Sequence, residues 1–151
     1  MTQEEILSFK QRILKDLYRY RNGLLADSLK KQGLPYKNIF GLLFPQLAEI
    51  ARNYPQDCDL AFSLWNEEEN REFRLLALYL MPHSVDKNII NQMSRLLKTK
   101  EEAELFPFRL LRHLPYAEEV YEELVSMKDE DLDMVTKHFI IMLGRNLGKE
   151  N

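Results

Sequence analysis

Apolar residues recur along most of the chain at the spacing of a helix. In the first segment they follow one another at intervals of three and four, at Ile6, Phe9, Ile13 and Leu17. This spacing places them on one face of an α-helix. The same periodicity returns in the later segments, and none alternates apolar and polar residues as a half-buried strand does. The sequence therefore predicts an all-α fold.

Residues that favour helix starts divide this pattern into about eight or nine helices, many of them short. Asn70 is expected to open one helix. Thr99, with Glu102 three residues later, forms the sequence pattern of a capping box. The last helix is expected to open at Asp129 or Asp131. Short helices at close intervals favour stacked helix pairs over one long four-helix bundle.

Residues 34–44 form an unusually apolar connection between two predicted helices. Tyr36, Ile39 and Phe40 give it the composition of a strand. No partner strand is predicted elsewhere, and Gly41 interrupts both helix and strand. We therefore expect a packed loop. The sequence leaves open whether its apolar side chains belong to the core or form an exposed docking surface.

A weak internal repeat accompanies the helices. Leucine-rich helices run into Pro82, then into Pro115, and finally into Gly144, at a spacing of roughly 30 residues, somewhat below that of HEAT units. The spacing predicts a HEAT-like superhelix of stacked antiparallel helix pairs, formed by a single domain that spans residues 1–151. Function usually resides on the concave face of such a solenoid.

Composition and charge narrow the class of protein. The chain has 151 residues, is 45% hydrophobic and carries a formal net charge of −3, which excludes a uniformly basic nucleic-acid binder. Residues 1–54 contain nine Lys and Arg against five Asp and Glu, whereas residues 55–151 contain twelve against nineteen. The N-terminal third is therefore suited to a polyanion and the remainder would repel one. The alternative is that the charges are scattered over solvated helix faces.

Signatures of cofactor chemistry and of membrane insertion are missing from the sequence. Cys58 is the single cysteine, and the histidines, His83, His113 and His138, lie on different predicted elements. The glycines stand singly, so no phosphate-binding loop is formed. We expect no metal and no cofactor. The apolar runs are too short to cross a bilayer and no signal peptide is evident, so we expect a cytoplasmic protein without a membrane partner.

Basic residues of the N-terminal third are the strongest functional candidates, because Lys and Arg at helix ends and in loops bind phosphates without selecting a base sequence. Trp65, the only tryptophan, is expected in the core, with stacking on a nucleobase as the alternative. The predicted DNA-binding residues are Arg12, Lys15, Arg19, Lys30, Lys31 and Lys37.

Three stretches of the chain resemble the AlkD-like DNA alkylation repair family. They are Phe40-Gly41-Leu42-Leu43-Phe44-Pro45-Gln46-Leu47-Ala48-Glu49-Ile50-Ala51, Leu60-Ala61-Phe62-Ser63-Leu64-Trp65 and Arg71-Glu72-Phe73-Arg74-Leu75-Leu76-Ala77. The resemblance covers roughly residues 5–112. It implies HEAT-like helix pairs whose concave basic face holds duplex DNA. In active members of the family this face excises alkylated purines without metal or cofactor.

The family's catalytic residues are not retained in this sequence. Thr99-Lys100 lies in register with the family's catalytic segment, but Ala103 replaces its tryptophan and Pro107 its aspartate. In the later helix that supplies the family's arginine, Lys137 is the only cationic substitute and a second candidate groove residue beside Trp65. The resemblance therefore implies a truncated, catalytically degenerate member, with no catalytic residue assigned.

Three functional hypotheses follow. The first is a DNA-repair-related, non-catalytic helical-repeat protein that contacts DNA phosphates. The second is a helical-repeat module for protein–protein interaction with no DNA role. The third is an active N-glycosylase that releases alkylated purines. The sequence makes no prediction of the oligomeric state or of a particular protein partner.

Overall fold

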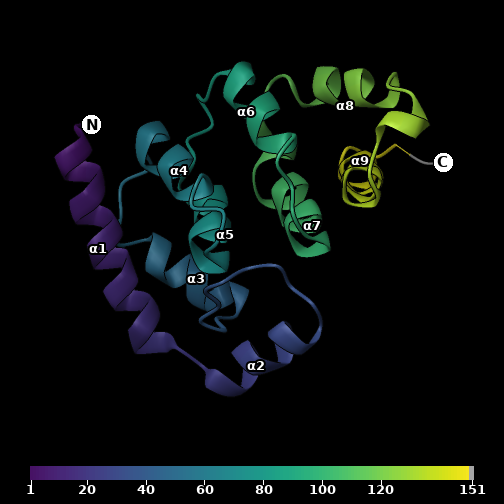
Figure 1. Ribbon diagram of the computed structural model, residues 1–151. Coiled ribbons are helices and arrows are strands. Elements are labelled where there is room, and N and C mark those ends of the chain that lie inside the picture. The colour runs from purple at the N-terminus through teal and green to yellow at the C-terminus, as the bar shows by residue number, and fades with distance from the viewer. Residues whose placement is uncertain (150–151) are drawn as a thin grey trace. The chain divides into compact units, whose positions relative to one another are not determined.

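The computed structural model describes residues 1–149 and confirms the all-α prediction (Figure 1). Within this range the chain forms helices and no strand. The α-helices are α1 (Gln3–Tyr20), α2 (Gly23–Lys31), α3 (Phe44–Ala51), α4 (Cys58–Trp65), α5 (Arg71–Leu80), α6 (Lys87–Ser94), α7 (Lys100–Arg109), α8 (Ala117–Val125) and α9 (Met134–Asn146), and the short 3-10 helices are η1 (Leu111–His113) and η2 (Asp129–Asp131).

The chain divides into two compact units. The first, Met1–Pro82, contains α1 to α5, and the second, His83–Asn151, contains α6 to α9 with η1 and η2. The expected pairing of consecutive helices holds for α4 and α5, which pack against each other. In the second unit, the main packing partner of α7 is α9 rather than α6 or α8. The HEAT-like superhelix and the single domain over residues 1–151 stay predictions.

Helix α5 lies at the centre of the first unit. It packs against α4 and α3, and every one of its residues is buried. The predicted N-cap is confirmed, because the Asn70 side chain accepts a hydrogen bond from the backbone N–H of Phe73 at 3.0 Å. Burial along the whole helix includes the charged residues Arg71, Glu72 and Arg74. Buried charges need partners, so the surroundings of α5 must supply them.

The connection over residues 34–44 supplies the partner of Glu72. The Glu72 carboxylate accepts hydrogen bonds from the backbone N–H groups of Phe40 at 2.9 Å, Gly41 at 3.0 Å and Leu42 at 3.3 Å, and it pairs with the Arg71 guanidinium. Phe40 and Leu42 are buried. The packed loop is therefore confirmed, and these side chains belong to the core.

Gly41 is required at its position in this loop. Its φ is +79°, in the left-handed region that side chains with a Cβ rarely adopt. A Cβ there would also collide with the backbone carbonyl oxygen of Asn22 and lie 2.8 Å from the backbone nitrogen of Ala26. The close approach of the loop to the start of α2 thus depends on glycine.

The second unit is organised by the contact between α7 and α9. Phe106 and Phe139 are both fully buried, and their ring centroids lie 5.5 Å apart. The prediction for the start of α9 was wrong by two to four residues. Asp133 caps the helix by accepting a 2.7 Å hydrogen bond from the backbone N–H of Thr136, while Asp129 and Asp131 form η2.

The start of α7 confirms half of the predicted capping box. The Thr99 hydroxyl accepts a hydrogen bond from the backbone N–H of Glu102 at 3.2 Å. The Glu102 carboxylate accepts a hydrogen bond from the backbone N–H of Lys98 at 2.8 Å. Pro107 lies in the last turn of α7, which ends at Arg109 before η1 begins.

Candidate functional site

Three basic residues of α1 lie on one face of that helix. Arg12, Lys15 and Arg19 are separated by three and four residues, which brings them to one face, and all three are exposed. Arg12 stacks over aromatic rings, 5.4 Å from the centroid of Phe9 and 5.3 Å from that of Tyr54. The Arg19 guanidinium lies 3.6 Å from a carboxylate oxygen of Asp16. Lys15 makes no ion pair within residues 1–149.

A hydrogen bond between Tyr54 and Asp16 fixes the aromatic ring on which Arg12 stacks. The Tyr54 hydroxyl donates to the Asp16 carboxylate at 2.5 Å. Burial, together with this hydrogen bond and the negative charge of Asp16, raises the pKa of Tyr54 above its ordinary value. The Tyr54 ring therefore stays neutral and in place, and it gives Arg12 a fixed surface on which to stack.

The other predicted DNA-binding residues lie elsewhere on the first unit. Lys30 and Lys31 are in the last turn of α2, and Lys37 follows in the loop. All three are exposed and make no ion pair within residues 1–149. Figure 1 shows α2 leading away from the end of α1, and its nine residues span about 13 Å. The predicted residues thus form two groups rather than one cluster.

Several other lysines are already paired with carboxylates. Lys10 lies 3.1 Å from Glu67 in the first unit. In the second unit, Lys87 contacts Glu119 at 2.7 Å and Glu123 at 2.5 Å. Lys137, the candidate groove residue of α9, lies 3.1 Å from the Asp129 carboxylate. A phosphate would have to compete with Asp129 for Lys137, whereas Lys15, Lys30, Lys31 and Lys37 face no such competition.

Trp65 lies in the core, as its place on the apolar face predicted. Its side chain has no exposed surface. The Arg74 guanidinium carbon lies 3.8 Å from the centroid of the indole, and an Arg74 N–H donates to the backbone carbonyl of Trp65 at 2.7 Å. A side chain enclosed in this way offers no face to a nucleobase, so the stacking alternative does not fit the structure.

Ala103 and Pro107, which the resemblance places at the family's tryptophan and aspartate, carry no carboxylate. Ala103 and Pro107 are both buried in α7. Glu104, a carboxylate of the same helix, is exposed and lies 2.9 Å from Nε2 of His138 in α9. Stabilising the cationic sugar left by base release requires a carboxylate fixed beside it, and these positions do not supply one.

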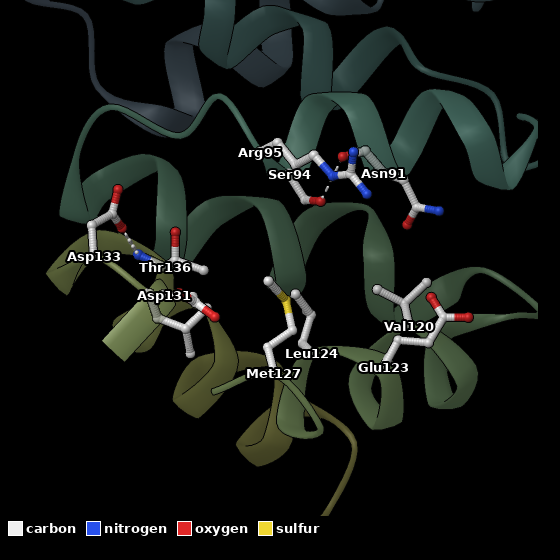
Figure 2. A pocket seen from close by; sticks show the side chains of 11 residues that line it. Asn91, Ser94, Arg95, Val120, Glu123, Leu124, Met127, Asp131, Asp133 and Thr136 are labelled. Atoms are coloured by element: carbon white, nitrogen blue, oxygen red, sulfur yellow. Dashed lines mark hydrogen bonds between the residues drawn. The ribbon is translucent and has the colours of Figure 1, made fainter. Parts of the chain in front are cut away.

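The second unit contains a cavity that the sequence analysis did not predict (Figure 2). Its volume is about 390 Å³, and α6, α8, η2 and the start of α9 surround it. The apolar part of the lining consists of Val120, Leu124, Met127 and Leu132. The polar lining residues are Asn91, Ser94, Arg95, Glu123, Asp131, Asp133 and Thr136.

The charged groups of the cavity are unevenly distributed. Asp133 stands beside Thr136 in Figure 2, and the hydrogen bonds from Thr136 hold the pKa of Asp133 below its ordinary value. Asp131 adds a second carboxylate and Glu123, which Lys87 contacts at 2.5 Å, a third, and Arg95 is the one basic lining residue. The cavity is therefore suited to an apolar group that carries a cation.

The sequence contained a weak signal for this cavity. Val120, Leu124 and Met127 recur at spacings of four and three, as residues on one helix face do. The same pattern is typical of a core face, and Val120 is indeed buried while Met127 is exposed. Only the arrangement of α6 and α9 beside α8 shows that this helix face lines a cavity and is not simply part of the core.

No family model, curated protein or solved structure matches the chain. The resemblance to the AlkD-like family therefore stays a prediction. No helix of residues 1–149 combines the length and the apolar character needed to span a membrane. In the same range, no three His, Cys, Asp or Glu side chains are grouped so as to hold a metal ion.

Proposed function

We propose that the chain is an AlkD-like, HEAT-like helical-repeat protein that binds duplex DNA through phosphate contacts of its first unit and does not excise bases. The observation that carries this proposal is the set of exposed lysines of the first unit that have no ion pair, Lys15, Lys30, Lys31 and Lys37.

Unpaired lysines favour phosphate binding for an energetic reason. A lysine that already contacts a carboxylate must lose that contact before it can bind a phosphate, which offsets much of the gain. Lys30 and Lys31 carry no such cost, and their binding to a phosphate releases condensed counterions from the DNA. Arg12 and Arg19 take a secondary role, because aromatic rings and Asp16 already engage them.

Salt-dependent binding to a fluorescent duplex tests the proposal. We expect the anisotropy of the duplex to rise with protein concentration and the affinity to fall steeply with salt. Lys30→Gln should reduce the slope of log affinity against log salt by about 1. Lys128→Gln, which removes an equally exposed lysine from the second unit, is the matched control and should leave the slope unchanged.

Two results would contradict this proposal. One is the absence of binding even at low salt. The other is an equal loss of slope in Lys30→Gln and Lys128→Gln, which would indicate unspecific attraction. Incubation with methylated duplex DNA addresses the catalytic part, for which we expect no release of 7-methylguanine.

The cavity of the second unit favours a second candidate function, a protein-interaction module. Its apolar lining and its three carboxylates are suited to a peptide that places an apolar side chain beside a Lys or Arg. Titration with a model Leu-Lys peptide, followed through the Met127 methyl resonance, tests this candidate. Shifts that disappear in Asp131→Asn would support it, and an unperturbed Met127 would reject it.

A further inference from the structure

Aromatic and cationic side chains gather where α7 ends and η1 begins. The rings of His83 and His113 stack with centroids 5.5 Å apart and planes inclined by 10°. Nε of Arg112 donates to Nε2 of His113 at 3.3 Å. The guanidinium carbon of Arg112 lies 4.2 Å from the centroid of the Phe108 ring. We call His83, Phe108, Arg109, Arg112 and His113 the Phe108 cluster.

The cluster lies at the surface rather than in the core. Phe108 is 52% exposed, although its neighbours Pro107 and Leu110 are buried. His83, Arg109 and His113 are also exposed. The Arg112 guanidinium stacks on Phe108 and leaves about half of that side chain in water, so a flat apolar surface remains accessible beside a cation.

The neighbouring charges that shift the pKa of His113 are all positive. Partial burial lowers the pKa of His113, and the neighbouring charges of Arg112, His83 and Arg109 lower it further. An arginine can only donate hydrogen bonds, so Nε2 of His113 accepts and the neutral ring carries its proton on Nδ1. The cluster is therefore a group of N–H donors in which a bound anion would relieve mutual repulsion.

We propose that the Phe108 cluster binds a single-stranded nucleic acid, with an unpaired base stacked on Phe108 and the adjoining phosphate held by Arg112 and the two histidines. An exposed aromatic ring beside cationic donors is the combination that recognises unpaired bases, because every base has a π-face. In a duplex those faces are covered by neighbouring base pairs. The site shares no residue with the lysines of the first unit, so it does not rest on the proposed duplex contacts.

Binding of two single strands of equal length to the whole chain distinguishes base stacking from attraction to the phosphates. One is a short fluorescent oligothymidylate, and the other carries abasic sites throughout, with the same number of phosphates. We expect the oligothymidylate to bind roughly tenfold more tightly. Phe108→Leu keeps an apolar side chain but removes the ring, and it should abolish this difference. Arg112→Gln should weaken binding of both strands.

Arg145→Gln is the matched control, because Arg145 is an exposed arginine of α9 outside the cluster. It should reproduce neither effect. The histidine ring resonances of the unmodified chain give a readout that requires no variant, and the oligothymidylate should shift those of His83 and His113 more than that of His138. Equal affinity for the two strands, no change in Phe108→Leu, or equal shifts of all three histidines would overturn the proposal.

Discussion

Replacing Glu72 by glutamine tests a buried carboxylate of the first unit that has several hydrogen-bond partners. Glu72 is fully buried, and its two carboxylate oxygens together accept three backbone N–H groups from Phe40, Gly41 and Leu42. Arg71, which is only 3% exposed, pairs with the same carboxylate. Glu72→Gln keeps the size of the side chain but removes its charge and one of its acceptor oxygens.

The expected loss of stability follows from these contacts. The amide NH₂ of glutamine would meet at least one backbone N–H donor to donor, and an unsatisfied buried donor costs about 1–3 kcal/mol. The Arg71 guanidinium would also lose its pairing with the Glu72 carboxylate, and breaking a buried ion pair costs about 3–5 kcal/mol. These costs overlap, so we expect the free energy of unfolding to fall by about 3–5 kcal/mol, a large part of the ~5–15 kcal/mol typical of a domain.

Urea unfolding followed by tryptophan fluorescence measures this loss. Trp65 is the only tryptophan, it is fully buried and it lies in the first unit, so its emission reports on that unit. Glu49→Gln, an exposed substitution in α3, is the control and should stay within about 0.5 kcal/mol of the unmodified chain. A loss below about 1 kcal/mol for Glu72→Gln would refute the reasoning.

Three further predictions concern single residues. Gly41→Ala should lower the melting temperature of the first unit, because its φ of +79° and the Asn22 carbonyl both oppose a Cβ; an unchanged melting temperature would contradict this. For Tyr54, whose pKa is raised, the unfolded chain loses its proton near pH 10 while the folded chain retains it, so stability should fall as the pH rises above about 10. Urea unfolding at pH 9 and at about pH 10.5 measures this loss of stability, and the loss should be smaller in Tyr54→Phe. Asp133→Ala removes the N-cap of α9 and should lower the free energy of unfolding by about 1 kcal/mol. Urea unfolding followed by circular dichroism measures this loss, and Asp131→Ala should lower the free energy of unfolding less.

Features of the fold that depend on neighbouring residues in the sequence could be predicted. The helix before Pro82 opens at Asn70 because an asparagine side chain reaches the backbone N–H three residues ahead, wherever the helix packs. The packed loop was predictable from its apolar content and the lack of any partner strand. The start of α9 was not, because Asp129, Asp131 and Asp133 are equally good caps and an intervening 3-10 turn decides among them.

Features that depend on distant contacts were out of reach. Nothing local indicates that Glu72 is fully buried, since its partners precede it by about 30 residues in a connection without regular structure. The stacking of His83 and His113 is likewise invisible in the sequence, where both are isolated residues. The cavity beside α8 is lined by a stripe that a core helix would also show. These two features therefore emerge only from packing, whereas the exposed lysines of the first unit were predicted from the sequence.

The hydrogen bonds between the loop and Glu72 have a consequence for local unfolding of the chain. Amides in irregular connections usually exchange with solvent hydrogen quickly, because their N–H groups face water. Those of Phe40 and Gly41 instead donate to a buried carboxylate on α5. They can be released only when α5 itself separates from the loop, so they should exchange as slowly as amides within that helix. The connection from Phe40 to Leu42 thus opens cooperatively with α5, and an insertion there would disturb the centre of the first unit.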